Sequence, residues 1–399
     1  MYSQQPDHSQ TFQMMFVPVR VAACHVSPIF LAAKATTEKA MSLINEAVRN
    51  KANLVVFPET YISAFPVWSS LRPPTENHDL FKRMVAESVY ADGEEISCIR
   101  SLARQTKTMV SIGVSEKIRS SSATLYNSNL IIGQDGEVLV HHRKLMPTFF
   151  EKLTWSPGDG HGLRVAITPF GKIGNLICGE NTNPLARYSL MAQGEQIHIS
   201  TWPAVWPTRL SKRTPEDSTN GFERQVSPPS APRTAKEAAN YDNVAANRTR
   251  AAAHCFEAKC FGVLCSGVLD ARAIEIMSSD CSNGAAVKTA LQESQRGATM
   301  FLDPTGTLLT GFTINDTTGA QEPTEVLQHE EGILYADLDV SECVEGKQYH
   351  DVVGGYQRLD VFELKVNRSR REPATFVDSG PELPTSYVKR DMSSSAEEH

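Results

Sequence analysis

The sequence predicts an α/β protein in which short strands alternate with amphipathic helices. Two observations indicate this class. Continuous apolar runs such as residues 54–59 (LVVFPE) are typical of strands buried in a parallel sheet, and the segments between such runs carry the 3.6-residue apolar period of helices. Two β-hairpins, at residues 130–144 and 299–312, interrupt the alternation. We therefore expect one large α/β domain with additional hairpins.

The first part of this domain contains three strands and two helices. Strands are expected at residues 20–26, 54–59 and 108–114, which are largely apolar and carry β-branched residues. A helix over residues 36–51 joins the first two strands, and a helix over residues 93–106 precedes the third. The apolar face of the first helix repeats at positions i, i+3, i+4 and i+7: Ala40, Leu43, Ile44 and Ala47.

The second part begins after the first hairpin, whose tight turn is supplied by Asp135 and Gly136. A short apolar strand at residues 172–178 runs into a helix, for which Asn183 is the expected cap and Pro184 the first helical residue. The next elements are, in order, a strand at 196–201, a helix at 245–260 and a strand at 261–268. In the second of these strands, His198 alternates with isoleucines and is expected to be a satisfied core histidine.

The α/β domain is expected to span residues 18–345. Within it, residues 211–240 are polar and rich in Pro, Ser and Thr, which predicts a surface insertion. Residues 1–17 and 372–399 are expected to be flexible tails. Residues 346–371 form a C-terminal arm that suits an edge strand, or an ordered arm packed on a neighbouring subunit or on its own core. Its apolar residues are Leu359, Val361, Phe362, Leu364 and Val366.

The composition excludes several classes of protein. Of the 399 residues, 41% are hydrophobic and 21% charged, which is ordinary for a globular domain and excludes a fibrous or mostly disordered chain. The formal net charge is −7 and no basic run occurs, so neither nucleic acids nor membrane surfaces are expected partners. No apolar stretch is long enough to span a membrane. The polar N-terminus lacks the features of a signal peptide, which predicts a cytoplasmic protein.

The cysteines and histidines do not form a recognisable metal site. The eight cysteines are expected to be free thiols, and none of them forms a CxxC pair. Their most regular spacing matches no zinc motif and is interpreted as buried small residues: Cys255, Cys260 and Cys265. His141 and His142 are adjacent on a predicted strand and should point to opposite faces of the sheet. We therefore expect no metal and no cofactor.

Three reactive side chains stand at the ends of predicted strands. Glu59 follows LVVFP, Lys144 follows EVLVHHR and Cys178 follows IGNLI. Because sites in open α/β sheets gather at the carboxyl ends of strands, these side chains are expected to share one pocket. The helix beyond Cys178 is expected to lower the pKa of the thiol and to favour the thiolate. Each residue alone would more often be structural, and it is the joint arrangement that indicates catalysis.

The segments around these residues resemble the nitrilase superfamily of carbon–nitrogen hydrolases. The similar stretches are FPET around Glu59, HHRKLMPTFFE around Lys144 and NLICGENTNPLARYSLMAQGEQIHIS around Cys178. The nitrilase branch is indicated by RKLMPTFFEKLTWSPGDG, AAAHCFEAKCF and YHDVVGGYQRLDVFEL. The resemblance covers about residues 18–370 without the insertion. It implies a four-layer αββα sandwich.

The resemblance also implies a role for each residue. Cys178 is the nucleophile, and Glu59 is the general base that takes its proton. Lys144 stabilises negative charge on the substrate nitrogen or the tetrahedral intermediate, and Glu151 lies near this lysine. The backbone N–H of Gly179 is expected to help stabilise that charge. These roles suit a nitrile, whose weakly electrophilic carbon needs a nucleophile as strong as cysteine.

Aromatic residues that follow the catalytic segments indicate an apolar substrate pocket. The expected lining is Tyr61, Phe65, Trp68, Trp155, Gly179 and Trp202. Two positions depart from many relatives, since Gly179 stands where they carry Trp and Asn181 stands where many carry His. The first departure is expected to enlarge the pocket or to free the backbone near the thiol. Both bear on substrate preference and leave the reaction class unchanged.

Together these observations predict a nitrilase without a cofactor, which converts an organic nitrile to a carboxylic acid and ammonia through a thioimidate and a thioester. The alternatives are a cyanide hydratase or amidase of the same superfamily, a catalytically silent filament scaffold and a Cys–His protease. The complete set of Glu59, Lys144 and Cys178 argues against the scaffold. The resemblance further implies a homodimer that assembles into a larger homo-oligomer or helical filament.

Overall fold

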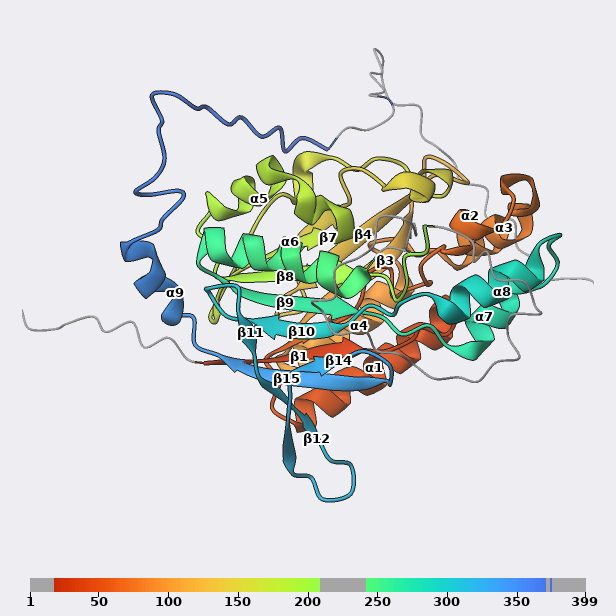
Figure 1. Cartoon of the computed structure of the whole chain (residues 1–399), viewed down its shortest axis with the longest axis horizontal. Helices are drawn as coiled ribbons and strands as arrows, with labels where there is room; N and C mark the ends of the chain where they lie inside the picture. The colour runs from red at the N-terminus through yellow and green to blue at the C-terminus, as the bar shows by residue number, and fades with distance from the viewer. Residues whose placement is uncertain (1–17, 209–241, 371–373, 375–399) are drawn as a thin grey trace, which may run out of the picture.

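The structure, a computed structural model, describes residues 18–208, 242–370 and 374 and consists of two β-sheets packed face to face between layers of helices (Figure 1). The predicted insertion at 211–240 and both predicted tails fall almost wholly outside these residues. The first sheet has the strand order β13 (Gln321–Thr324), β12 (Gly311–Ile314), β15 (Gly332–Leu338), β1 (Val19–His25), β2 (Leu54–Val56), β3 (Met109–Lys117), β4 (Leu125–Ile132) and β5 (Val138–Arg143).

The second sheet also combines parallel and antiparallel strands, and it has fewer strands than the first. Its order is β11 (Leu308–Leu309), β10 (Thr299–Leu302), β9 (Phe261–Ser266), β8 (Ile197–Trp202), β7 (Gly171–Ile177) and β6 (Ala166–Thr168), and β14 (Val326–Leu327) also pairs with β10. In each sheet three neighbouring strands are parallel, β1–β2–β3 and β7–β8–β9, and the other pairs are antiparallel. The carboxyl ends of these parallel strands are where α/β proteins build their sites.

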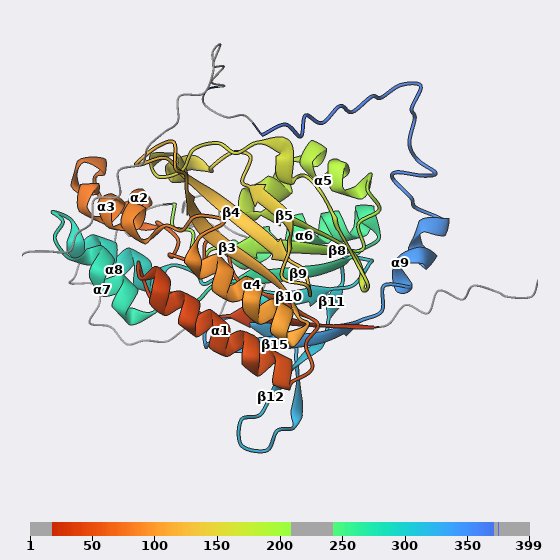
Figure 2. The ribbon, with the colours of Figure 1, turned by 180° about the vertical axis from the view of Figure 1, so that it is seen from behind.

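Helices cover the outer face of each sheet, which completes the four-layer αββα sandwich that the family resemblance implies (Figure 2). Helices α1 (Ala33–Arg49) and α4 (Glu94–Thr106) pack on the first sheet, and α5 (Pro184–Met191) and α6 (Asn243–Ala258) pack on the second. The core between the sheets is formed by alternate strand residues such as Val21, Val56, Ile131, Ile199, Val263 and Phe301. A further group lies at one end: α2 (Trp68–Leu71), α3 (His78–Glu87), α7 (Ala271–Ser278) and α8 (Gly284–Glu293).

The predicted hairpin at residues 130–144 is formed by β4 and β5, with Gly136 in the turn at a φ of +79°. His141 and His142 point to opposite faces of the sheet, as expected. His141 bonds Glu116 (2.8 Å) on one side, and His142 bonds Glu180 (2.8 Å) on the other. The second hairpin is shorter than predicted, because the chain leaves β11 and crosses into the first sheet as β12.

The described part of the C-terminal arm, residues 346–370, contains no β-strand, which corrects the prediction of an edge strand. After α9 (Glu342–Glu345) and one 3₁₀ turn, the described part of the arm is irregular and runs around the outside of the sandwich (Figure 1). Val366 packs near helix α5 rather than beside an open strand, so the arm has no ladder partner. Two large apolar residues, Leu359 and Phe362, are 77% and 74% exposed. Arg370 returns to the body and bonds Asp159 at 3.1 Å.

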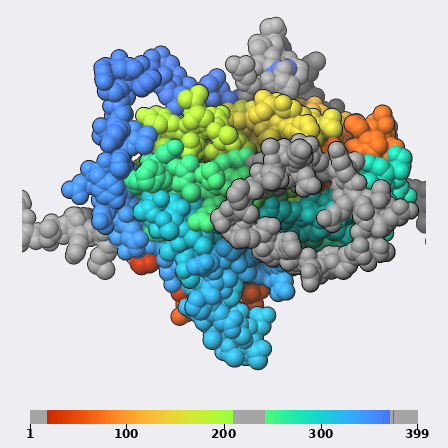
Figure 3. Space-filling model, in the orientation of Figure 1, coloured from red at the N-terminus to blue at the C-terminus, as the bar shows by residue number. Residues whose placement is uncertain are grey.

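Other features follow the sequence closely. Asn183 caps α5 by accepting hydrogen bonds from two backbone N–H groups, and Pro184 is the first helical residue. The three regularly spaced cysteines are fully buried: Cys255, Cys260 and Cys265. Among the described residues, no helix is long and apolar enough to cross a membrane. Figure 3 shows how the protruding β12–β13 hairpin extends from the surface of the sandwich.

Candidate active site

The structure brings the three predicted strand ends together. Glu59 lies three residues beyond β2, Lys144 directly follows β5, and Cys178 directly follows β7. Both sheets therefore contribute to the site. A carboxylate oxygen of Glu59, a carboxylate oxygen of Glu151 and the Cys178 sulfur all lie within 4.8 Å of one another. A thiol, two carboxylates and an ammonium thus meet in one buried place.

The ammonium group of Lys144 joins the two carboxylates. Its Nζ donates to Glu59 Oε1 at 2.9 Å and to the two oxygens of Glu151 at 2.9 and 2.7 Å. Burial lowers the pKa of Lys144, but Cys178, Glu151 and Glu59 outweigh burial and raise that pKa well above its usual range. Lys144 is therefore a permanent cation. Its ammonium lies between the two carboxylates.

Glu59 keeps one oxygen available for proton transfer. Oε1 accepts from Lys144 and from Asn127 Nδ2 (2.7 Å), whereas the buried Oε2 has no hydrogen-bond partner among the described residues. Burial raises the pKa of Glu59 to about 7, although Lys144 acts in the opposite direction. Such a carboxylate is suited to accept a proton near neutral pH. Sequence reasoning missed Asn127, because nothing in the pattern of β4 marks it.

Cys178 occupies a strained turn between β7 and the short 3₁₀ helix Cys178–Thr182. Its φ is +50°, in the left-handed region that costs a residue with a Cβ roughly 1–2 kcal/mol. The expected lowering of the thiol pKa is wrong. Burial, and after it Glu59, raises the pKa of Cys178 well above its usual range, because one short helical turn does not replace the water lost around a thiolate. Burial therefore favours the thiol form of Cys178 over the thiolate.

A second residue that sequence reasoning missed, Glu180, links the two catalytic turns. Its carboxylate accepts hydrogen bonds from the backbone N–H groups of Ile177 (2.9 Å) and Leu145, and it also bonds His142 Nε2. Ile177 precedes Cys178 and Leu145 follows Lys144, so the Glu180 carboxylate fixes the position of the Cys178 turn relative to the Lys144 turn. The only sequence signal for this residue was its place two positions after the nucleophile.

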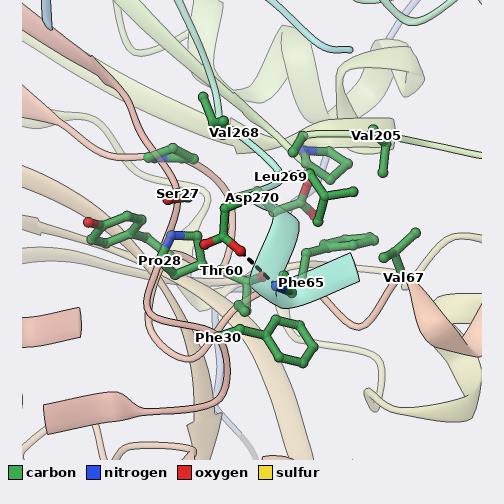
Figure 4. Close-up of a pocket in the computed structure, with 18 of the residues that line it drawn as sticks. Ser27, Pro28, Phe30, Thr60, Phe65, Val67, Val205, Val268, Leu269 and Asp270 are labelled. Carbon is green, nitrogen blue, oxygen red and sulfur yellow. Dashed lines mark hydrogen bonds between the residues drawn. The ribbon is translucent and has the colours of Figure 1, made fainter. Parts of the chain in front are cut away.

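A pocket opens beside Glu59, where the loops that follow β1, β2, β8 and β9 converge (Figure 4). Its lining is mostly apolar and includes Pro28, Phe30, Phe65, Val67, Val205 and Leu269. Two of the predicted pocket residues, Tyr61 and Phe65, line it. Its Asp270 is engaged elsewhere, since it caps helix α7 through the backbone N–H of Ala273 at 2.7 Å. The pocket therefore offers apolar contact beside the Glu59 carboxylate.

Comparison with known proteins identifies the family. A family model described as carbon-nitrogen hydrolase matches residues 20–348. The chain belongs to the carbon–nitrogen hydrolase family. It is 33% identical over 351 residues to an arylacetonitrilase of Hypocrea virens, which covers 88% of this chain and 92% of the relative. It is also 30% identical to a cyanide hydratase of Alternaria brassicicola, with 93% of this chain and 90% of the relative covered.

A solved structure supports the fold of this carbon–nitrogen hydrolase. A carbon–nitrogen hydrolase from Helicobacter pylori superimposes with a TM-score of 0.58 at 18% sequence identity. The match covers 87% of this chain and 97% of the other. At this identity the similarity shows the sandwich architecture alone.

In this carbon–nitrogen hydrolase the predicted tryptophans do not line the pocket beside Glu59. Trp68 and Trp155 are buried in the core next to helices α2, α3, α7 and α8. Trp202 is also buried and packs with Cys178, so it supports the nucleophile from the side of β8. These residues stiffen the walls around the site.

Gly179 has a packing role that differs from the expected enlargement of the pocket. A Cβ added at this position would lie 2.7 Å from Thr148 Oγ1. Thr148 belongs to the segment between Lys144 and Glu151. Because residue 179 has no side chain, the segment that contains Thr148 can lie close to the turn at Cys178. No side chain of residue 179 covers the backbone next to the thiol.

Proposed function

We propose that this enzyme is a nitrilase in which Cys178 is the nucleophile, Glu59 the general base and Lys144 the stabiliser of negative charge. The observation that carries the proposal is the buried thiol placed beside a carboxylate with a free oxygen and a lysine cation. The similarity to proteins named arylacetonitrilase and nitrilase supports a nitrile as the substrate. The apolar pocket beside Glu59 suits the organic part of such a molecule.

The reaction begins with attack of the Cys178 sulfur on the nitrile carbon. The thiol proton passes to Glu59 and from Glu59 to the nitrile nitrogen, so that a neutral thioimidate forms and Glu59 is again a base. Lys144, aided by the backbone N–H of Gly179, stabilises the charge that develops on nitrogen. Glu59 then removes a proton from water, whose oxygen adds to the same carbon, and passes this proton to the nitrogen. The remaining hydroxyl proton moves to the nitrogen as the C–N bond breaks, so ammonia leaves and a thioester remains.

A second water molecule, again activated by Glu59, hydrolyses the thioester and releases the carboxylic acid with the free thiol. Glu151 holds Lys144 in place through both carboxylate oxygens throughout this cycle. The balance between acid and amide depends on which bond of the first tetrahedral intermediate breaks. Loss of the thiol instead of ammonia yields an amide, which is the outcome of a cyanide hydratase.

Product analysis tests this proposal. The purified enzyme is incubated with aliphatic, aromatic and arylacetonitriles and with cyanide, and ammonia, acid and amide are measured together. Equal amounts of acid and ammonia from an organic nitrile support the nitrilase. Formamide from cyanide alone would favour the second candidate, a cyanide hydratase, which the similarity to the Alternaria protein supports. Turnover of amides without turnover of nitriles would contradict both.

The raised pKa of Glu59 predicts the pH profile. A general base must be unprotonated to act, so kcat/KM should rise with pH through an ionisation near 7, the value to which burial raises the Glu59 pKa. Below that pH the rate should fall about tenfold per unit. Initial rates between pH 5 and 9 measure the effect. A flat profile across pH 7 in the wild-type enzyme would remove Glu59 from the role of base.

We also propose that the enzyme acts in the cytoplasm and assembles into a homodimer and larger homo-oligomers. The exposed apolar residues of the C-terminal arm, Leu359 and Phe362, support the arm as a subunit contact. The double variant Leu359→Ser with Phe362→Ser should reduce particle size by light scattering, and it should leave the fold intact because both side chains are exposed. Removal of residues 372–399 is the control and should leave particle size unchanged. An unchanged large particle from the double variant would contradict this role.

A further inference from the structure

A second cluster of buried titratable groups lies behind the nucleophile turn. Glu195 lies two residues before β8, His198 lies in β8 and His254 lies in α6, and none of them is more than 1% exposed. One carboxylate oxygen of Glu195 bonds His198 Nδ1 at 2.8 Å, and the other bonds His254 Nε2 at 2.6 Å. The two rings stack with their centroids 3.7 Å apart. His198 is thus the satisfied core histidine that the sequence predicts.

Asn181 connects this cluster to the nucleophile. Its Nδ2 donates to the backbone carbonyls of Leu176 (3.2 Å) and Cys178 (3.0 Å). Because carbonyl oxygens only accept hydrogen bonds, the amide nitrogen must be on this side and the amide oxygen on the other. Asn181 Oδ1 accepts from the hydroxyl of Ser200 (3.3 Å) and lies 2.8 Å from His198 Nε2.

This arrangement determines the protonation state of His198. Its Nε2 faces the amide oxygen of Asn181 and its Nδ1 faces the carboxylate of Glu195, and both of these partners are acceptors. Both of these hydrogen bonds form together only when each ring nitrogen of His198 donates a proton. Although burial raises the pKa of Glu195, His198 and His254 outweigh burial and lower that pKa to about 2. The Glu195 carboxylate is therefore ionised and accepts from both rings.

His254 is in the opposite state. Its Nε2 donates to Glu195, while its buried Nδ1 has no hydrogen-bond partner among the described residues. Burial and the neighbouring His198 lower the pKa of His254 to about 4, so the ring is neutral at physiological pH. His254 is therefore a second hydrogen-bond donor to the Glu195 carboxylate, and it has no contact with Asn181 among the hydrogen bonds described above. A substitution of His254 is a matched control, because it leaves the hydrogen bonds from Glu195 through His198 and Asn181 to Cys178 in place.

We propose that Glu195 and His198 are positioning residues for the reaction, which fix Asn181 and through it the backbone of Cys178. The proposal rests on the assignment of Cys178 as the nucleophile. With both nitrogens donating, His198 holds the oxygen of the Asn181 amide and leaves Nδ2 to bind the carbonyls on either side of Ile177. These bonds hold the left-handed conformation of Cys178, which an isolated chain disfavours. A neutral His198 would have to release one of its two acceptors.

The first test compares Glu195→Gln with His254→Gln. The Glu195 variant removes the charged acceptor at His198 Nδ1, whereas the His254 variant keeps the chain of hydrogen bonds from Glu195 through His198 and Asn181 to Cys178. Glu195→Gln should lower kcat by about tenfold or more with KM changed less than about threefold, as expected for loss of an interaction that orients the reacting group. His254→Gln should stay within about threefold of wild type in both constants. Thermal unfolding of both variants reports any general loss of stability.

The second measurement does not depend on nitrile turnover. Iodoacetamide is added to each variant at fixed pH, and peptide mapping follows alkylation of Cys178. The partly exposed Cys98 and Cys281 serve as internal references. Glu195→Gln should slow alkylation of Cys178 relative to these references, and His254→Gln should not. If wild type turns over no nitrile but this difference persists, the proposed function fails and the positioning role stands.

A third variant keeps the proposal testable if Glu195→Gln does not fold. Asn181→Ala removes the link and leaves the Glu195–His198 pair, so it should lower kcat by a similar factor. The double variant should lose little more than either single variant, because both break the same connection. The proposal is overturned if Glu195→Gln and Asn181→Ala retain kcat within about threefold of wild type. It is equally overturned if Glu195→Gln and His254→Gln lose kcat and thermal stability to the same extent.

Discussion

Replacement of Cys178 by alanine should abolish nitrile turnover, with a loss of at least about 10⁴-fold in kcat/KM, because no other side chain can form the covalent intermediate. The substitution removes one small buried sulfur, so the fold should survive. Measurement of ammonia release with a sensitive assay checks the loss, and circular dichroism checks the fold. Cys178→Ser keeps a side chain of nearly the same size and shape. This variant should be almost as inactive as Cys178→Ala, because a hydroxyl is a far weaker nucleophile than a thiol.

The matched control is Cys265→Ala, which removes another fully buried thiol at the end of a parallel strand of the same sheet. This variant should keep wild-type kcat/KM and lose only some stability, by about 1 kcal/mol for a small cavity. Activity above about one tenth of wild type in Cys178→Ala would show that the nucleophile is another residue.

Lys144→Arg should be nearly inactive although the positive charge is kept. The lysine is fully buried, and its ammonium donates three hydrogen bonds to Glu59 and Glu151 from a single atom. A guanidinium is planar, larger and directional, so it cannot place a compact charge between two carboxylates and beside the substrate nitrogen. We expect kcat to fall by about 10³-fold or more, the size of effect seen when a charge-stabilising donor is lost. Steady-state kinetics measure it.

The neighbouring residue supplies the control for Lys144→Arg. Arg143→Lys makes the reverse exchange one position earlier, where the guanidinium pairs with Glu116 outside the site. It should leave kcat within about threefold of wild type and lower stability slightly. If Lys144→Arg kept near-normal kinetics, charge alone would suffice and the compact placement of the ammonium would have no role.

The sequence predicted the α/β class and the meeting of Glu59, Lys144 and Cys178 because these properties depend on local patterns. Apolar runs mark buried strands, and reactive residues at their carboxyl ends converge when the strands are parallel. The resemblance to a family supplied the roles and the four layers. Glu151 was placed correctly next to Lys144, and it bonds the ammonium through both oxygens.

Properties that depend on tertiary environment could not be obtained in this way. The pKa of Cys178 rises instead of falling because burial removes the water that would stabilise a thiolate, and burial is decided by the packing of distant segments. The cluster of Glu195, His198 and His254 joins a loop, a strand and a helix, and no spacing in the sequence reveals it. The arm failed to become a strand because alternation alone does not supply an open edge.

The most direct test of the central claim is detection of the covalent intermediate. Wild-type enzyme is mixed with a nitrile, quenched in acid during turnover and digested, and the peptides are analysed by mass spectrometry. The account predicts an added acyl or imidate mass on the peptide that contains Cys178, which disappears when the substrate is exhausted and is absent from Cys178→Ala. Turnover with the added mass on another cysteine, or with wild-type rates in the Cys178→Ala enzyme, would contradict it.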